Sequence, residues 1–352
     1  MSEYYLPSEW HCQSLIQLTW PHAGTDWNYI LHEVEDCYLH ITREIVKREP
    51  LLIVSPEVDS VKCFLTKNNV EVGNIIFFEC DTNDTWARDH GFITLLNKKG
   101  TPLLLDFRFN GWGLKFAANK DNQINSKLYR SGLLNGAYKD CRNYVLEGGS
   151  IESDGKGTLL TTTECLLSPN RNDTLDVHEI ESFLKERFGL KQVLWLRHGY
   201  LAGDDTDSHV DTLARLCPND TIVYVKCTDA RDEHYNALKL MEEELKNFRT
   251  LCGQPFRLLP LPMADEVRDI EGNRLPATYA NFLIMNEAVL YPTYNQVAND
   301  TKAKEILTEA FPDKDIVGIN CLALIQQHGS LHCSTMQFPE GVYIKKWKES
   351  LK

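Results

Sequence analysis

Short apolar runs alternate with turn signals along much of this chain. Four of them, at residues 101–105, 157–160, 220–225 and 287–291, each follow a turn signal. Apolar runs of this length, bounded by turn residues, are typical of buried β-strands. The chain is therefore predicted to contain many short strands.

Helical spacing of apolar residues appears between some of these runs. Residues 177–188 show it ahead of the apolar run 193–196, and residues 301–311 show it ahead of the run 316–319. Strands that alternate with helices indicate a mixed α/β fold. We expect the polar clusters to lie at strand ends and in the following loops, where chemistry is usually found.

The strand-like runs also suggest a weak internal repeat. The last three recur at roughly sixty to seventy residues, longer than the common solenoid repeats. The alternative is the ordinary alternation of strands and helices in any α/β protein. No linker rich in Ser, Gly or Pro and no low-complexity tract divides the chain, so a single domain over residues 1–352 is expected.

Composition narrows the class of partner. The formal charge of −13 argues against nucleic acid and anionic membranes, which call for clustered Lys and Arg, and it suits a small cation better. We see neither a signal peptide nor an apolar stretch long enough to span a membrane. Eleven scattered cysteines without tight spacing are then expected to be reduced thiols. These features favour the cytoplasm.

One cysteine differs from the rest in its context. Cys333 lies in a polar, Gly-containing turn after the apolar stretch 316–325, as if a strand delivered a nucleophile to the mouth of a site. Free cysteines are commonly buried and inert, which is our expectation for the other ten. Because Cys333 is flanked by His332 and Ser334, we consider it a candidate nucleophile.

A second candidate cluster is acidic and contains a histidine. Alternation along a strand would place His209 and Asp211 on one face, with Val210 on the other. A base and a carboxylate would then face the same space. The alternative is an acidic surface turn, because three more aspartates precede His209, Asp205 among them.

A third cluster combines carboxylates with tryptophan. Asp89 and Trp86 could hold a guanidinium or ammonium ion between a carboxylate and an indole face. Arg88 is either part of such a site or a structural ion pair with a nearby aspartate. Trp112 could form a second wall or belong to the core.

The segment Glu147-Gly148-Gly149 allows close approach of the backbone, but alone it is typical of a turn. Metal binding is the main rival for all these residues, since His328, His332 and Cys333 are closely spaced. No HExxH or paired CxxC pattern is present, so no metal is expected. The chain also has neither a GxGxxG nor a GxxxxGK[ST] loop.

Taken in order, these clusters carry a resemblance that spans most of the chain, through residues 86–91, 109–113, 147–151, 204–211 and 329–333. The sequence resembles the agmatine deiminase and bacterial-type peptidylarginine deiminase family of the guanidine-modifying, or pentein, superfamily. Each motif alone is modest, but five in this order are specific.

The resemblance implies a five-bladed, pseudo-symmetric α/β propeller of ββαβ modules around a central channel. It also implies that Cys333 is the nucleophile and His209 the general acid/base. Asp89 and Asp211 would bind the guanidinium, and Glu147 would orient His209. No metal or cofactor is required for this chemistry.

The function expected from the resemblance is hydrolysis of agmatine to N-carbamoylputrescine and ammonia. The family would have a segment close to Ile-His-Cys-Ile-Thr-Gln-Gln at the nucleophile, whereas residues 331–337 read Leu-His-Cys-Ser-Thr-Met-Gln. This difference bears on the substrate more than on the chemistry. Alternatives are a peptidylarginine or other guanidine deiminase, an amidinotransferase, and a non-catalytic binding protein of propeller type.

Further substrate contacts are expected from Trp86, Trp112, Arg88 and Asp205. A homo-oligomer is compatible with the sequence. Candidates for lining the entrance are four aromatic residues and one loop: Tyr4, Tyr5, Trp10, Trp20 and the loop after Tyr279.

Overall fold

The computed structural model describes residues 3–343. Within them the strands form five separate sheets, and each contains an antiparallel pair followed by a parallel strand. A helix connects the second strand of the pair to the parallel strand in every case. The fold is therefore a mixed α/β fold, as predicted.

The first sheet contains strands from both ends of the chain. Its order is β17-β2-β3-β4, with β17 (Thr335–Pro339), β2 (Gln13–Thr19), β3 (Leu51–Ser55) and β4 (Ile75–Glu79). Helices α1 (Leu31–Val46) and α2 (Val58–Lys67) make its crossovers. The antiparallel pairing of β17 with β2 joins the C-terminal part of the chain to the N-terminal part.

The second and third sheets follow in sequence. The second has the order β1-β5-β6-β7 and the third β10-β9-β8. Their elements are β1 (Tyr4–Tyr5), α3 (Ala87–His90), β5 (Ile93–Asn97), β6 (Pro102–Arg108), α4 (Gly111–Leu114), α5 (Asp121–Arg130), β7 (Ala137–Val145), β8 (Ile151–Ser153), β9 (Thr158–Thr162), α6 (Thr163–Leu166), α7 (Val177–Phe188) and β10 (Gln192–Leu196).

The last two sheets have the orders β11-β12-β13 and β14-β15-β16. Their elements are β11 (Ala214–Cys217), β12 (Thr221–Lys226), α8 (Tyr235–Asn247), β13 (Arg257–Pro262), β14 (Leu283–Ile284), β15 (Ala288–Thr293), α9 (Val297–Ala310) and β16 (Asp315–Asn320). Short 3₁₀ turns lie at 26–30, 72–74, 148–150, 210–212 and 324–327.

Local sequence explains where these elements begin and end. Helix α7 starts at Asp176, whose carboxylate accepts hydrogen bonds from the backbone N–H groups of His178 and Glu179, while the Glu179 side chain bonds back. This capping box satisfies N–H groups that the first turn would otherwise leave unpaired. The helix ends at Gly189, whose φ of 68° suits a residue without Cβ.

All four strand-like runs predicted from sequence are strands, and each is the second strand of an antiparallel pair: β6, β9, β12 and β15. The helix expected at residues 177–188 is confirmed, and the one expected at 301–311 begins four residues earlier, as α9. The stretch 316–325 is not one strand, because β16 ends at Asn320 and a 3₁₀ turn follows.

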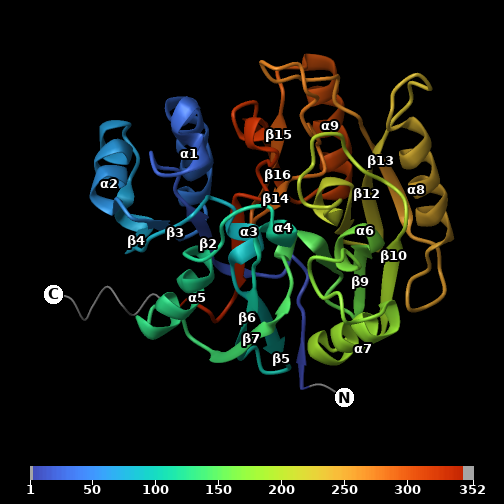
Figure 1. The fold of residues 1–352 in the computed structure, drawn as a ribbon, viewed down its shortest axis with the longest axis horizontal. Coiled ribbons are helices and arrows are strands. Elements are labelled where there is room, and N and C mark those ends of the chain that lie inside the picture. Colours follow the sequence, from blue (N-terminus) through green and yellow to red (C-terminus); the bar gives the residue numbers. More distant parts are fainter. Residues whose placement is uncertain (1–2, 344–352) are drawn as a thin grey trace.

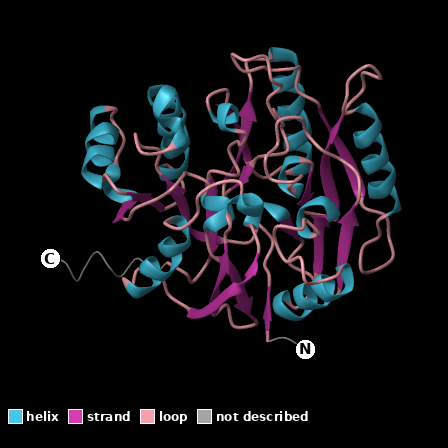
Figure 2. Ribbon diagram, viewed as in Figure 1, coloured by secondary structure: helices cyan, strands magenta, loops and turns pink. Residues whose placement is uncertain are grey.

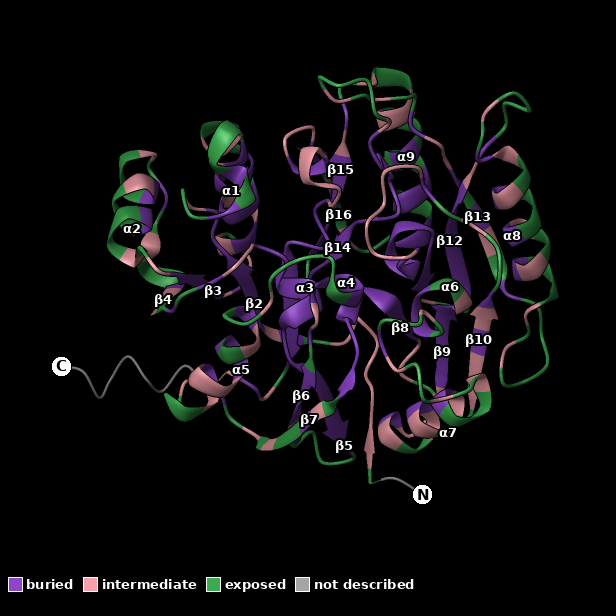
Figure 3. Ribbon diagram, in the orientation of Figure 1, coloured by how far each residue is buried: buried purple, intermediate pink, exposed green. Residues whose placement is uncertain are grey.

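In this view helices α1, α2, α8 and α9 lie toward the rim of the molecule, while strands β5, β6 and β7 reach its lower edge (Figures 1 and 2). Buried residues concentrate on the strands and the inward faces of the helices, while the outer helix faces are exposed (Figure 3). The short helices α3 and α4 lie near the centre, where the functional clusters also gather (Figure 1). No helix within residues 3–343 is long and apolar enough to cross a membrane.

Phe338 of β17 tests how far the fold depends on the closing strand. Its side chain is fully buried and lies opposite Leu15 of β2. Phe338→Ala should lower the free energy of unfolding by about 3–5 kcal/mol, because it removes buried surface and leaves a cavity. Val297→Ala, at an exposed position, should change it by less than about 0.5 kcal/mol. Equal denaturation midpoints for the two variants would contradict this role of β17.

Candidate functional site

The candidate nucleophile lies just before β17, in the turn that leads into that strand. The Cys333 side chain is buried, and its Sγ lies 3.3 Å from Asn281 Nδ2 and 3.8 Å from Asp211 Oδ2. The side-chain oxygen of Asn281, Oδ1, also accepts hydrogen bonds from the backbone N–H groups of His332 and Cys333. Asn281 therefore fixes both the thiol and the backbone that carries it.

Asp89 is presented by the short helix α3, which follows the loop after β4. One carboxylate oxygen accepts a hydrogen bond from Trp112 Nε1 at 2.9 Å, and the other accepts one from Gly149 N at 3.0 Å. A Cβ atom on Gly149 would lie 2.6 Å from His209 Nδ1 and 2.9 Å from Asp89 Oδ1. Only glycine fits there, which explains the Glu-Gly-Gly triplet.

His209 directly precedes a 3₁₀ turn at residues 210–212, and Asp211 lies within that turn. The alternating strand expected from sequence is therefore wrong, although both side chains still face the site while Val210 packs in the core. His209 Nδ1 lies 3.7 Å from Asp89 Oδ1, and Asp211 Oδ2 lies 2.7 Å from His332 Nδ1. Within the described part of the chain, neither ring nitrogen of His209 has a hydrogen-bond partner.

Glu147 is fully buried behind these residues. Both of its carboxylate oxygens accept from Arg171 Nε, at 2.9 and 3.1 Å, and Arg171 also contacts Asp207. The expected Glu147–His209 pair is close without a hydrogen bond, since their polar atoms lie within 4.8 Å of each other. Arg171, which sequence reasoning missed, thus sets the position of Glu147.

A pocket of about 400 Å³ opens onto Cys333. Cys333, Asp89, Trp86, Trp112 and Asp205, all predicted site residues, line it. The rest of its wall is formed by Asp84, Phe116, Thr206, Gln327, His328 and Gly329. His209, Asp211 and Glu147 lie behind this wall, so the predicted catalytic residues converge on one place.

Arg88 is the exception among the predicted substrate contacts. It lines a different cavity, of about 580 Å³, which Glu9 and Gln337 also line. Its guanidinium bonds Glu9 Oε1 at 2.9 Å and the Gln337 side chain. Arg88 therefore does not line the pocket at Cys333. It forms a structural ion pair, but with Glu9 and not with the nearby aspartate expected from the sequence.

The aromatic residues expected at the entrance do not line the pocket either. Trp20 is buried in the core against Tyr38, and Tyr4 and Tyr5 form β1 at a sheet edge. Trp10 packs on the core. The loop after Tyr279 does reach the site, but through Asn281 at the thiol and not at the entrance.

Glu9 lies at the centre of a charge network beneath the site. Its carboxylate contacts Arg88, Arg215 Nη2 at 2.6 Å and His332 Nε2 at 2.9 Å. His332 in turn contacts Asp211. Although burial opposes ionisation, the charges of Arg88, His332 and Arg215 hold the pKa of Glu9 well below its usual value. No sequence motif points to Glu9, which lies 323 residues from His332.

Burial and like charges perturb the groups at the pocket. Burial, and then repulsion by Asp211, raises the pKa of Asp89 to about 8. Burial alone would raise the pKa of Asp211, but the hydrogen bond with His332 lowers it. Burial lowers the pKa of His209 to about 3. Burial, with Asp211 and Asp89 nearby, raises the pKa of Cys333 well above its usual value.

The geometry agrees with comparisons to known proteins. The sequence profile of the Porphyromonas-type peptidyl-arginine deiminase family matches residues 5–339. The chain belongs to this family within the pentein superfamily, and it is a hydrolase acting on C–N bonds of linear amidines.

Three similar proteins represent the comparisons. A "Putative agmatine deiminase" of Shewanella baltica is 30% identical over 96% of this chain and 95% of its own length. The "Putative Arginine Deiminase" structure from Porphyromonas gingivalis is 50% identical, with a TM-score of 0.91 over 97% of this chain and 100% of its own. A cysteine-to-serine variant of the C. jejuni agmatine deiminase with substrate bound is 39% identical, with a TM-score of 0.89 over 96% and 97%.

The variant Glu9→Gln tests the charge network. It would leave Arg88 and Arg215 buried without their shared carboxylate, so the free energy of unfolding should fall by about 3–5 kcal/mol. Glu3→Gln, at an exposed position near the same end of the chain, should change it by less than about 0.5 kcal/mol. Chemical denaturation of both variants measures the difference, and a Glu9→Gln value within that same small range would overturn the role of Glu9.

Proposed function

We propose that this protein is an agmatine deiminase, which hydrolyses agmatine to N-carbamoylputrescine and ammonia through a covalent intermediate on Cys333. The observation that carries the proposal is that the Cys333 thiol meets two buried carboxylates: Asp211, whose Oδ2 lies 3.8 Å from Sγ, and Asp89, which lines the same pocket as Cys333. The relatives named as agmatine deiminases support it. A binding protein that had lost catalysis would not need this thiol.

Asp89 and Asp211 are proposed to bind the guanidinium. This group is planar and charged, and carboxylates at its edges can hold it by paired, charge-assisted hydrogen bonds. Asp211 Oδ1 is buried and lacks a partner within residues 3–343, so it has a free acceptor for a substrate N–H group. Edge-on binding leaves the face of the guanidinium carbon open to Cys333.

The reaction then proceeds in two halves. Cys333 Sγ forms a bond to the guanidinium carbon, and the thiol proton passes to neutral His209. His209 returns that proton to the departing nitrogen, which leaves as ammonia, and a thiouronium remains on Cys333. Water, deprotonated by His209, adds to the same carbon. The C–S bond then breaks as His209 returns its proton to the Cys333 sulfur, and the hydroxyl proton is lost to solvent as the ureido product leaves. Arg171 and Glu147 are proposed to position His209.

Substrate charge is proposed to help activate the thiol. In the empty site burial, and then the charge of Asp211, disfavour a thiolate at Cys333, and Asp89 adds to this only where it is ionised. A bound guanidinium neutralises these carboxylates and places positive charge beside the sulfur, which lowers the cost of forming the thiolate. Cys333 should therefore react most readily when a cation is bound.

The outer part of the pocket favours agmatine over arginine. Asp84 and Asp205 add carboxylates to the wall, and Trp86 and Trp112 provide indole faces for an aliphatic chain or an ammonium group. Among the described lining residues none is lysine or arginine, so the α-carboxylate of arginine would meet acidic groups. Asp205 is proposed to contribute to recognition of the distal amine.

The architecture we infer is a five-bladed pentein propeller forming a single domain. The five sheets, each with an antiparallel pair followed by a parallel strand, support it, as does the position of helices α1, α2, α8 and α9 toward the rim in Figure 1. Each sheet would be one blade, with β17 and β2 closing the ring. The cytoplasmic location, the absence of a required cofactor and a homo-oligomeric state stay predictions.

Ammonia release from agmatine, free arginine and an arginyl peptide tests the function. We expect turnover to be fastest with agmatine and to be abolished by Cys333→Ser, because the serine hydroxyl is a far weaker nucleophile than a cysteine thiol near neutral pH. Cys63→Ser, at an exposed cysteine, is the matched control and should retain activity. Faster turnover of arginine or the peptide would reassign the substrate. Full activity of Cys333→Ser would remove Cys333 from its role.

The pKa of Asp89 gives a pH prediction. Its value of about 8 means that the carboxylate is largely protonated at pH 7 in the free enzyme, and it must lose that proton to bind the cation. The value of kcat/KM for agmatine, which reports on free enzyme, should rise with pH through about 8. The value of kcat should not show this rise with pH, because bound guanidinium keeps Asp89 ionised. Steady-state kinetics showing a flat kcat/KM across this range would refute the assignment.

A further inference from the structure

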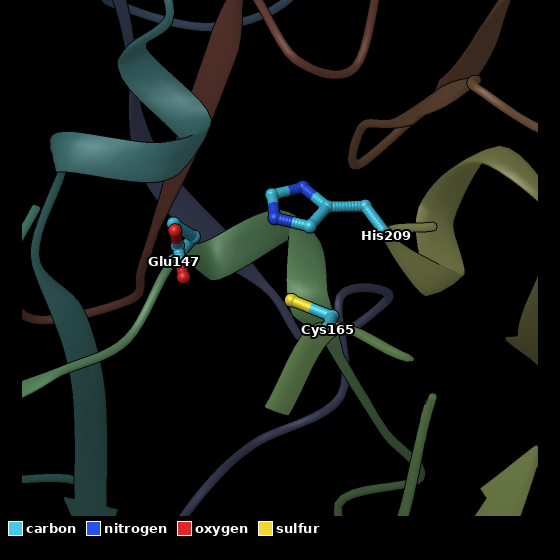
Figure 4. Close-up of side chains that lie close together, drawn as sticks. All are labelled: Glu147, Cys165 and His209. Atoms are coloured by element: carbon cyan, nitrogen blue, oxygen red, sulfur yellow. The ribbon is translucent and has the colours of Figure 1, made fainter. Parts of the chain in front are cut away.

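A second cysteine lies against the catalytic cluster, and the proposed reaction does not use it. Cys165 belongs to α6, is fully buried, and is held in place by a hydrogen bond from its backbone N–H to Thr162. The Cys165 thiol, the Glu147 carboxylate and a His209 ring nitrogen all lie within 4.8 Å of one another. Figure 4 shows the three side chains converging from separate segments, with one edge of the His209 ring turned toward the other two.

This cluster has free coordination capacity. Neither ring nitrogen of His209 has a partner within residues 3–343, although the residue is fully buried. The Glu147 carboxylate accepts from Arg171 Nε and from a backbone N–H group, and a carboxylate offers about four lone-pair sites. Arg171 is paired with Asp207 as well as with Glu147, so Asp207 still offsets the Arg171 charge when Glu147 binds a metal. Buried polar atoms without partners are rare and mark a site that can gain by binding.

The donor set selects the metal class. Thiolate sulfur, imidazole nitrogen and carboxylate oxygen together match Zn²⁺ and similar borderline-soft ions, and they match Ca²⁺ or Mg²⁺ poorly. Donor atoms around a tetrahedral Zn²⁺ lie about 3.5 Å apart, given bonds of about 2.0–2.3 Å. The present donor separations, all within 4.8 Å, would have to close by at most about 1.3 Å to reach this geometry. Water can occupy the fourth position.

We propose that Glu147, Cys165 and His209 form an inhibitory Zn²⁺ site. Binding replaces the S–H bond of Cys165 by a Zn–S bond and releases that proton to solvent, and no group is oxidised or reduced. Zinc on His209 occupies the lone pair that would otherwise accept and donate protons during turnover. The enzyme is active without the metal and is silenced by it, a consequence that rests on the proposed function, whereas the binding itself does not.

A direct binding experiment separates this site from the nucleophile. Co²⁺, a spectroscopic substitute for Zn²⁺, is added to the Cys333→Ser protein, and thiolate-to-cobalt charge-transfer absorption is recorded. The absorption should appear in Cys333→Ser, persist when Cys141→Ala is added, and vanish when Cys165→Ala is added instead. Cys141 is a matched control because it is also a buried cysteine of the same apolar cluster as Cys165.

Two outcomes would overturn the site. One is no absorption in the Cys333→Ser protein, and the other is unchanged absorption after Cys165→Ala. Thermal unfolding of each variant shows whether it is folded. If the alanine variant is not, Cys165→Ser keeps the side-chain size and should bind Zn²⁺ at least about tenfold more weakly, as expected when a metal site is impaired. Equal affinity in the serine variant would also overturn the site.

Inhibition of agmatine turnover tests the consequence. Half-inhibition of Cys165→Ala should need at least about tenfold more Zn²⁺ than the wild type or Cys141→Ala, and a chelator should restore activity. Equal sensitivity of all three proteins would overturn the inhibitory role and point to metal capture at Cys333. If no guanidine is turned over at all, the proposed function fails, while the cobalt experiment still decides whether the metal site exists.

Discussion

Two carboxylates buried beside one another, Asp89 and Asp211, set the main constraint on this structure. Like charges in a desolvated site raise each other's energy unless they are protonated, hydrogen-bonded or paired. The protein stabilises the two carboxylates in different ways. Asp211 is stabilised as an anion by His332, whereas Asp89 receives N–H groups from Trp112 and Gly149 and has a pKa of about 8. Of these two carboxylates, Asp211 is therefore charged in the empty pocket, whereas Asp89 is largely protonated at pH 7 and becomes charged when a cation binds.

Much of the surrounding structure follows from supporting Asp211. His332 is held from below by Glu9, whose charge is shared with Arg88 and Arg215. These residues come from the N-terminal segment, the α3 helix, strand β11 and the turn before β17, so one ionic cluster ties four distant parts of the chain to the axis of the site. Such clusters seldom add net stability, because desolvation offsets their attraction. Here the ionic cluster instead fixes the orientation of Asp211 through His332.

The sequence was informative where a feature is local. Apolar runs predicted strands β6, β9, β12 and β15, and the Gly149 position could be read from its triplet because only a missing side chain allows the close approach. Contacts between remote segments have no such signal. Asn281 at the thiol and Glu9 below the site carry no motif of their own. Trp20 was predicted to line the entrance but is buried in the core, because an aromatic side chain suits either place.

The same arrangement that recognises the substrate also restrains the nucleophile. Burial and the charge of Asp211 raise the pKa of the Cys333 thiol in the empty pocket, and a protonated thiol resists oxidation and alkylation, reactions that require the thiolate. A guanidinium removes that restraint at the moment its own carbon is in place. His209 must stay neutral and without a hydrogen-bond partner until it accepts a proton. Its ring nitrogens are therefore buried beside Cys165 without a partner within residues 3–343. Because these buried groups lack partners before the guanidinium substrate binds, the proposed Zn²⁺ ion can bind His209 instead.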